Sequence, residues 1–283
     1  MSLLLLNRST EFDLPVAGRT AQRRRARAFT LIEMLVVIGI IGALAAIATP
    51  SLKGLKQANL LASANRQLLD DLGMARLKAM SDRTTVYMIF VPTNIAQMAG
   101  NFSRPEDRRV ATNLAKGVYT TYALVSRRTV GDQPGRFTPR FLTGWQTLPQ
   151  GVVIPELKFI GATNRLTVAP FDKAPFDVNQ VFPFDRVTGL PFPTSQGMQA
   201  AASQISLPCI GFDSKGQLVN GRDELIPLIR GDVLFGRDAA GQSRYFVRQE
   251  GLANRVLTFN DVQAVSVNWL TGRARVISAE FKK

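Results

Sequence analysis

Residues 29–50 read FTLIEMLVVIGIIGALAAIATP, and this stretch decides how the rest of the chain is organised. It is 22 residues long, and Glu33 is its single charged residue. At about 1.5 Å of rise per residue, a helix of this length extends about 30 Å, the hydrocarbon thickness of a bilayer. The stretch is therefore expected to form a transmembrane helix.

The residues before this stretch carry a cluster of positive charge. Arg23, Arg24, Arg25 and Arg27 lie directly ahead of the apolar segment. Basic residues next to a membrane segment are retained on the cytoplasmic side. We therefore expect a single-pass protein with a cytoplasmic N-terminus, whose C-terminal part is exported.

Three interpretations of this segment compete. It resembles a secretory signal peptide with small-residue cleavage options such as Ala46-Ile47-Ala48, or a plain membrane anchor, or the signal of a subunit that assembles through its membrane helix. Glu33 distinguishes them, because a carboxylate near the start of an apolar helix costs up to about 2.5–3.5 kcal/mol on insertion. A signal peptide or passive anchor has no use for that charge. A subunit that pairs the charge with a partner does, which favours the third interpretation.

The residues from Ala28 to Glu33, AFTLIE, resemble the cleavage motif of type IV prepilins and type II secretion pseudopilins. In that family a small residue, usually Gly, precedes the cut, and Ala28 stands there in this chain. The following Phe becomes N-methylated, and Glu is fifth in the mature chain. The resemblance implies a leader of residues 1–28, a cut between Ala28 and Phe29, methylation of Phe29 and assembly through Glu33. Pro50 falls at a position where many pilins carry Pro.

Residues 51–82 are expected to continue the helix as an amphipathic segment. Apolar residues recur there at helical spacing, with charged residues on the other faces. Pro50 lacks an N–H, so a kink or local melting is expected where the two helical segments join. The apolar face consists of Leu61, Leu68, Leu69, Leu72, Ala75 and Ala79.

Residues 83–283 are predicted to form a β-rich domain with irregular insertions at about 95–150 and 161–204. Short runs of β-branched and aromatic residues predict its strands. The firmest prediction is a hairpin in which Val262–Leu270 and Arg273–Phe281 flank a turn at Thr271-Gly272. The predicted fold class is α+β, with a long N-terminal helix packed on an antiparallel sheet. The other predicted strands are Thr84–Val91, Val118–Val125, Val152–Ile160, Ile205–Phe212, Asp232–Phe235 and Arg244–Arg248.

Two C-terminal motifs carry a finer resemblance. Gly211–Gly216 and Val267–Val276 are similar to the strand-turn signature and the closing hairpin of H-type (FimT-like) minor pseudopilins. The resemblance implies a minor subunit of a pilus-like fibre, in a type II secretion system or a type IV pilus of the inner membrane, with its C-terminal domain in the periplasm. The implied partners are other pilins or pseudopilins, a prepilin peptidase and an inner-membrane assembly platform.

A second candidate function is DNA binding. The chain has a net charge of +14, and Arg273 and Arg275 would lie on the same face of a strand. Two guanidinium groups on one face can contact phosphates, and FimT-like pilins of competence systems resemble this pattern. The alternative is that both arginines are simply solvated on an outer face.

Catalytic chemistry is not expected. The chain has no histidine, which excludes catalysis by a Ser-His-Asp triad and histidine-ligated metal sites. Its single cysteine, Cys209, lies in an apolar run and is predicted to be a core residue. No cofactor and no metal site are therefore expected, and an anchored enzyme is the least favoured hypothesis.

Overall fold

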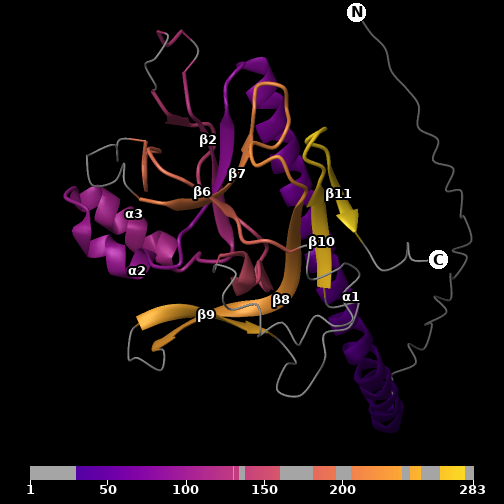
Figure 1. The fold of residues 1–283 in the computed structure, drawn as a ribbon. Coiled ribbons are helices and arrows are strands. Elements are labelled where there is room, and N and C mark those ends of the chain that lie inside the picture. Colours follow the sequence, from indigo (N-terminus) through magenta and orange to yellow (C-terminus); the bar gives the residue numbers. More distant parts are fainter. Residues whose placement is uncertain are drawn as a thin grey trace, which may run out of the picture. The chain divides into compact units, whose positions relative to one another are not determined.

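The computed structural model describes residues 30–129, 131–133, 138–159, 181–195, 205–237, 243–249 and 262–277. The chain divides into two compact units, Met1–Ser51 and Leu52–Lys283. The predicted α+β class is confirmed, because the chain combines an N-terminal helix with further helices and antiparallel sheets (Figure 1).

The described part of the first unit is the start of helix α1, which spans Leu31–Ser81. Its side chains are exposed from Leu31 to Ala45. The large apolar ones include Leu31 at 84% and Ile38 at 68% exposure. The predicted N-terminal helix is thus confirmed, and its first turns present an uncovered apolar surface.

In the second unit, the last turns of α1 pack on the β-rich domain. Leu61, Leu68, Leu72, Ala75 and Ala79 are all buried, as the helical spacing predicts, and Leu69 is half-buried. Each fully buried leucine contributes about 1.5–3 kcal/mol of stabilisation relative to an exposed one. This apolar face is what fixes the helix to the domain.

Polar contacts fix the position of α1 along this face. Gln67 donates a hydrogen bond to the hydroxyl of the buried Tyr122 at 3.1 Å, and that hydroxyl donates to Asp71 Oδ2 at 2.6 Å. The Asn65 amide contacts the side chain of Gln263. Tyr122 and Gln263 belong to different sheets, so α1 contacts both. Only one sheet was expected from the sequence.

The first sheet has six strands, all antiparallel, in the order β3-β2-β1-β7-β6, with β4 also paired to β2. Every residue of its central strands β1 and β2 is buried. Because side chains alternate across a strand, both faces of the sheet are covered there. The strands are β1 (Val86–Phe90), β2 (Thr121–Ser126), β3 (Arg140–Phe141), β4 (Gln146–Thr147), β6 (Asp185–Val187) and β7 (Leu207–Phe212).

The second sheet has five strands in the order β11-β10-β8-β5, with β9 also paired to β8. The predicted hairpin is confirmed, since β10 and β11 are antiparallel neighbours with Ser266 opposite Arg275. The inner half of β8 is buried and pairs with β10, whereas its outer half pairs with β9. The strands are β5 (Val152–Val153), β8 (Glu224–Arg237), β9 (Ser243–Gln249), β10 (Val262–Val267) and β11 (Ala274–Ile277).

Regular structure extends into the segment 95–150, which was predicted to be irregular. Helices α2 (Ile95–Met98), η1 (Ala99–Asn101) and α3 (Pro105–Ala115) follow β1. A further short helix, η2 (Glu156–Lys158), replaces most of the strand predicted at Val152–Ile160. Pro155, which has no N–H for a ladder, precedes this helix directly. The second predicted insertion, 161–204, lies mostly outside the described residues.

Candidate functional site

The first turn of α1 is defined by Thr30. The Glu33 backbone N–H donates to Thr30 Oγ1 at 3.2 Å, and the Met34 N–H donates to the Thr30 carbonyl at 3.2 Å. Thr30 is therefore the N-cap, which satisfies backbone donors that have no partner within the helix. The Thr-x-x-Glu spacing is that of a capping box. The helix thus begins two residues after the predicted cut.

Glu33 lies in the first turn of the helix and is exposed. A carboxylate at this end of a helix interacts favourably with the partial positive charge of the unpaired N–H groups. Glu33 is also the single charge in an otherwise apolar segment from Leu31 to Pro50. A partner that covers this segment would bury the Glu33 carboxylate. Such a partner must therefore supply a cation for Glu33.

Three further predictions concern the same segment. Ala28 and Phe29 lie outside the described residues, so the predicted cut and methylation stay predictions. Pro50 lies within α1, in a part of the helix whose side chains are outside the description. Among the described residues, no helical segment combines the length and the apolarity needed to cross a membrane.

The turn of the β10–β11 hairpin is closely bonded. Gly272 donates its N–H to the Asn268 carbonyl at 2.8 Å, and the Asn268 N–H donates to the Arg273 carbonyl at 3.0 Å. Gly272 has a φ of +61°, which favours glycine. A Cβ placed on it would lie 1.9 Å from the carbonyl oxygen of Gly216. Both the backbone conformation and this close approach require glycine here.

The hairpin turn is joined to two other elements. The Arg76 guanidinium of α1 donates to the Thr271 carbonyl at 2.7 Å, and the Leu218 N–H donates to the Trp269 carbonyl at 2.8 Å. The adjoining turn is closed by Asp213, whose Oδ1 accepts from the backbone N–H groups of Lys215 and Gln217. The motifs at Gly211–Gly216 and Val267–Val276, far apart in the sequence, therefore lie against one another.

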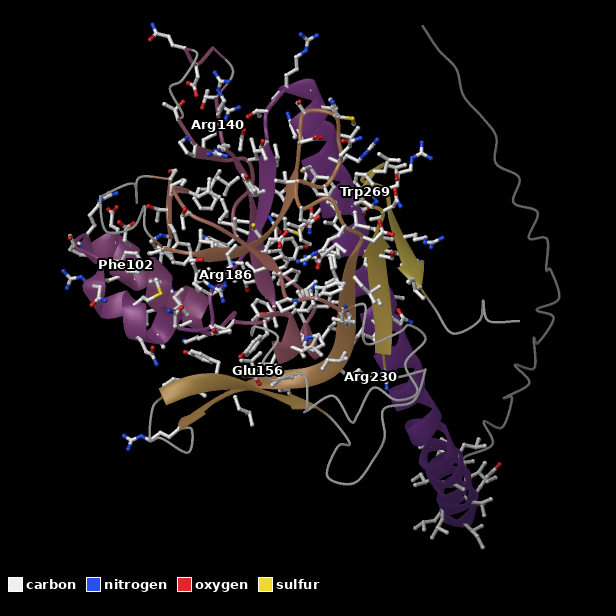
Figure 2. The ribbon with its side chains drawn as sticks, viewed as in Figure 1. Phe102, Arg140, Glu156, Arg186, Arg230 and Trp269 are labelled. Carbon is white, nitrogen blue, oxygen red and sulfur yellow. The ribbon has the colours of Figure 1, made fainter. Side chains whose placement is uncertain are left out.

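Exposed side chains gather around this turn. Arg273, Arg275 and Lys215 are exposed, and Trp269 and Leu270 are 38% and 53% exposed. Figure 2 shows Trp269 at the end of the hairpin. Among the ion pairs of the described residues, none includes Arg273 or Arg275. We call these five residues the hairpin patch; a basic surface with an exposed aromatic ring is suited to a polyanion.

The arginines of the hairpin patch are predictable from the sequence, but the contacts that position the patch are not. Arg273 and Arg275 are both exposed, with the half-buried Ala274 between them, as alternation along a strand predicts. The contribution of Arg76 was missed. Its contact with Thr271 joins residues 195 positions apart, and no local pattern indicates such a contact.

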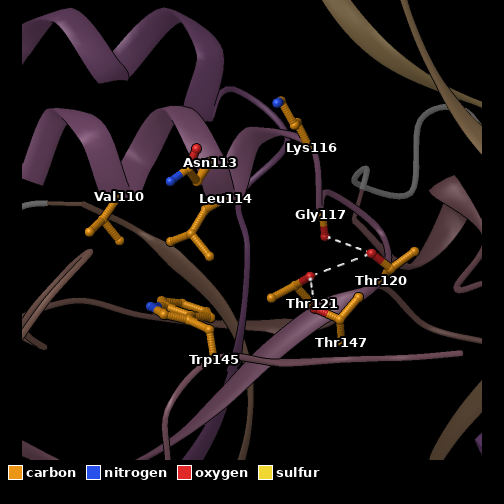
Figure 3. Close-up of a pocket in the computed structure, with 9 residues that line it drawn as sticks. All are labelled: Val110, Asn113, Leu114, Lys116, Gly117, Thr120, Thr121, Trp145 and Thr147. Atoms are coloured by element: carbon orange, nitrogen blue, oxygen red, sulfur yellow. Dashed lines mark hydrogen bonds between the residues drawn. The ribbon is translucent and has the colours of Figure 1, made fainter. Parts of the chain in front are cut away.

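A pocket of about 340 Å³ lies between α3 and the strand pair β2–β4 (Figure 3). Its polar groups include the Thr121 and Thr147 hydroxyls, which are 3.0 Å apart. Lys116 is the single charged residue in its lining, and the lining has no carboxylate or thiol. Such a site lacks a general acid–base pair. It is lined by Val110, Asn113, Leu114, Lys116, Gly117, Thr120, Thr121, Trp145 and Thr147.

Cys209 is buried, as predicted, and burial raises the pKa of its thiol to about 12. A thiol with so high a pKa is a poor nucleophile at neutral pH. Within the part of the chain that the structure describes, no group of His, Cys, Asp and Glu is arranged to hold a metal ion.

Residues 23–49 match the family described as "Prokaryotic N-terminal methylation motif". No curated protein matches the chain, and no solved structure matches it. The match spans the basic flank, the Ala28–Glu33 motif and most of the apolar segment.

Proposed function

Residues 23–49 carry a type IV prepilin-like signal, and from this we propose that the chain is a minor pseudopilin that assembles into a pilus-like fibre of a type II secretion system or a type IV pilus. The observation that carries the proposal is the coincidence of this signal with the start of α1. Thr30 caps the helix, Glu33 lies in its first turn, and the side chains that follow form an exposed apolar surface.

The exposed apolar surface of α1 supports assembly through the helix. Soluble proteins rarely leave a contiguous apolar surface of this kind uncovered. In the proposed pathway the segment 29–50 first spans the inner membrane, with the N-terminus cytoplasmic and the C-terminal domain periplasmic. The same surface then packs against the helices of neighbouring pilins in the fibre. Partners would be other pilins, a prepilin peptidase and the inner-membrane assembly platform.

Glu33 has a specific role in this proposal. Packing the helices buries its carboxylate, and an uncompensated buried charge costs several kcal/mol. The α-amino group of Phe29 on a neighbouring subunit is a suitable cation, because it exists only after the leader is removed. Processing would thereby be required for assembly. In this proposal the role of Glu33 is structural.

The first prediction concerns processing. Mass spectrometry of the protein extracted from membranes is expected to show an N-terminus at Phe29 that carries one added methyl group. The leader, residues 1–28, should be absent. An N-terminus at Thr49, directly after Ala46-Ile47-Ala48, would establish an ordinary signal peptide and contradict the proposal.

A second candidate function is capture of DNA by a FimT-like minor pilin. The hairpin patch favours it, because Arg273 and Arg275 are exposed next to Lys215 and an exposed tryptophan ring. Guanidinium groups contact phosphates at two oxygens, and neutralised phosphates release counterions. Binding of this kind would be strongly salt-dependent and independent of sequence.

The second prediction tests DNA binding. Combining Arg273→Ala with Arg275→Ala is expected to weaken binding to duplex DNA uniformly across sequences. It should also reduce the slope of log affinity against log salt by about two, one for each lost phosphate contact. Fluorescence anisotropy between low and physiological salt measures both effects.

The matched control combines Arg109→Ala, on α3, with Lys116→Ala, directly after α3; the pair removes the same charge from exposed positions outside the hairpin patch. If this control weakens binding as much as the hairpin variant, binding is a property of net charge and the patch has no special role. No binding by the wild-type protein at low salt would leave only the structural function.

A further inference from the structure

A buried ion pair joins η2 to the start of β8. The Lys158 side chain on η2 is 0% exposed, and that of Glu224, at the start of β8, is 2% exposed. Lys158 Nζ contacts Glu224 Oε1, donates to the Phe182 carbonyl at 2.5 Å and lies 4.4 Å from the centre of the Phe184 ring. Removing both charges from water costs several kcal/mol per ion. This desolvation free energy offsets much of the attraction within the pair, so the pair contributes little net stability to the fold.

The same carboxyl group also contacts a primary amide. Asn220 Nδ2, in the turn before β8, donates to Glu224 Oε2 at 3.4 Å. The Asn220 carbonyl oxygen, Oδ1, accepts from the backbone N–H of Arg222 at 3.3 Å. Glu224 therefore connects an amine and an amide through its two oxygens, while a backbone donor polarises the amide carbonyl.

The environment favours the uncharged forms of both partners. Burial lowers the pKa of Lys158 and raises the pKa of Glu224. A neutral amine has a free electron pair and is a nucleophile, whereas an ammonium is not. The aromatic ring beside Nζ excludes water from the group.

We propose that Lys158, Asn220 and Glu224 form an intramolecular isopeptide site, in which Lys158 Nζ becomes bonded to Asn220 Cγ. The product ties η2 to the turn between β7 and β8 by a covalent bond. Such a bond suits a subunit that bears load in a fibre, but its formation does not depend on how the chain is assembled.

The reaction balances without any co-reactant. The electron pair of Nζ attacks Cγ of Asn220, and the Arg222 N–H stabilises the negative charge that develops on Oδ1. The protonated Glu224 delivers its proton to Nδ2 and takes one from Nζ, so it is regenerated. The Cγ–Nδ2 bond breaks and ammonia leaves. One amide replaces another, and nothing is oxidised or reduced.

The test is peptide mapping of the full-length protein extracted from membranes. Tryptic digestion followed by tandem mass spectrometry is expected to yield a branched peptide that contains both Lys158 and Asn220. Its mass should equal the sum of the two peptides less one ammonia, and cleavage after Lys158 should be blocked. The measurement is made on the wild-type chain, so it does not depend on whether a variant folds.

Variants assign the roles. Glu224→Gln keeps the size of the side chain but removes the proton shuttle, and Lys158→Met removes the nucleophile; each is expected to abolish the branched peptide. The matched control is Asn268→Ala. Asn268 also donates from Nδ2 to a carboxylate, Asp223 Oδ1, at 3.3 Å, and its loss should leave the branched peptide intact.

Three outcomes would overturn the proposal. The first is two unlinked peptides of unmodified mass. The second is a Lys158–Glu224 link with loss of water. The third is loss of ammonia confined to the single peptide around Asn220-Gly221, which is the signature of a succinimide formed with the next residue. Each is distinguished from the expected branched peptide by its fragment ions.

Discussion

A chain that carries Glu33→Leu is expected to insert into the membrane as well as wild type and to be lost almost completely from fibres or tip complexes. Leucine removes the carboxylate and leaves the α-amino group of the neighbouring Phe29 buried without a counter-charge. Breaking a buried ion pair in this way costs about 3–5 kcal/mol, which is a reduction in affinity of more than about 100-fold. Co-purification with pilus or secretion components measures incorporation, and carbonate extraction measures insertion.

The control must remove a charge from the same helix without touching the assembly surface. Asp70→Asn does so, because Asp70 is exposed on α1 far along the chain from the apolar segment. Glu33→Gln preserves the shape of the side chain but not its charge, and should fail like the leucine variant. Wild-type levels of Glu33→Leu in fibres would show that the charge has no role in assembly.

The second large effect is expected at Gly272. Gly272→Ala should lower the free energy of unfolding by about 2–4 kcal/mol, because alanine is strained at positive φ and its Cβ would overlap a backbone carbonyl. That Cβ would lie 1.9 Å from Gly216 O, so the hairpin and the adjoining turn must separate. Thermal or urea unfolding of the detergent-solubilised protein, followed by circular dichroism, measures the loss.

Gly189→Ala separates the effect of backbone strain from the effect of the overlap between the Cβ and the Gly216 carbonyl. Gly189 also has a positive φ, +76°, but a Cβ there would meet no atom within 4 Å. It should therefore show only the backbone strain, about 1 kcal/mol. Equal losses at the two positions would mean that the contact between the hairpin and the 213–217 turn contributes nothing beyond backbone strain.

The elements that the sequence predicted correctly are those with local signals. The buried face of α1 follows from helical spacing alone, and the β10–β11 hairpin follows from two β-rich runs around Thr271-Gly272. The exposure of Arg273 and Arg275 follows from alternation along that hairpin. In each of these three cases a pattern of residues close together in the sequence is enough to predict the structure.

The elements that were missed have weak or misleading local signals. Only Asp232–Phe235 was predicted from β8, although the strand begins at Glu224. Pro227 explains this, because a proline argues against a central strand, and here it lies opposite Ala264 of β10. Helix α3 was missed although its first turn carries a typical helix-start pattern. Pro105 is followed there by the acidic residues Glu106 and Asp107.

The setting of the candidate sites could not be predicted at all. Arg76 and Thr271 are 195 positions apart, and Lys158 and Glu224 are 66 apart. Their contacts depend on how α1, η2 and the second sheet pack, which no local pattern specifies. The sequence could name the surface arginines but not the helix that supports their turn.

The capping of α1 by Thr30 has a consequence for the order of events during maturation. The hydrogen bonds described at the first turn end on the oxygens of Thr30, which lies on the C-terminal side of the proposed cut. Removing residues 1–28 would therefore trim the chain without unwinding the helix. Precursor and mature subunit would share one conformation in this segment and differ only at the new N-terminus, which gains an amine and a methyl group. Cleavage by the peptidase would then be the step that permits polymerisation. A cleaved subunit would not need to refold before it assembles.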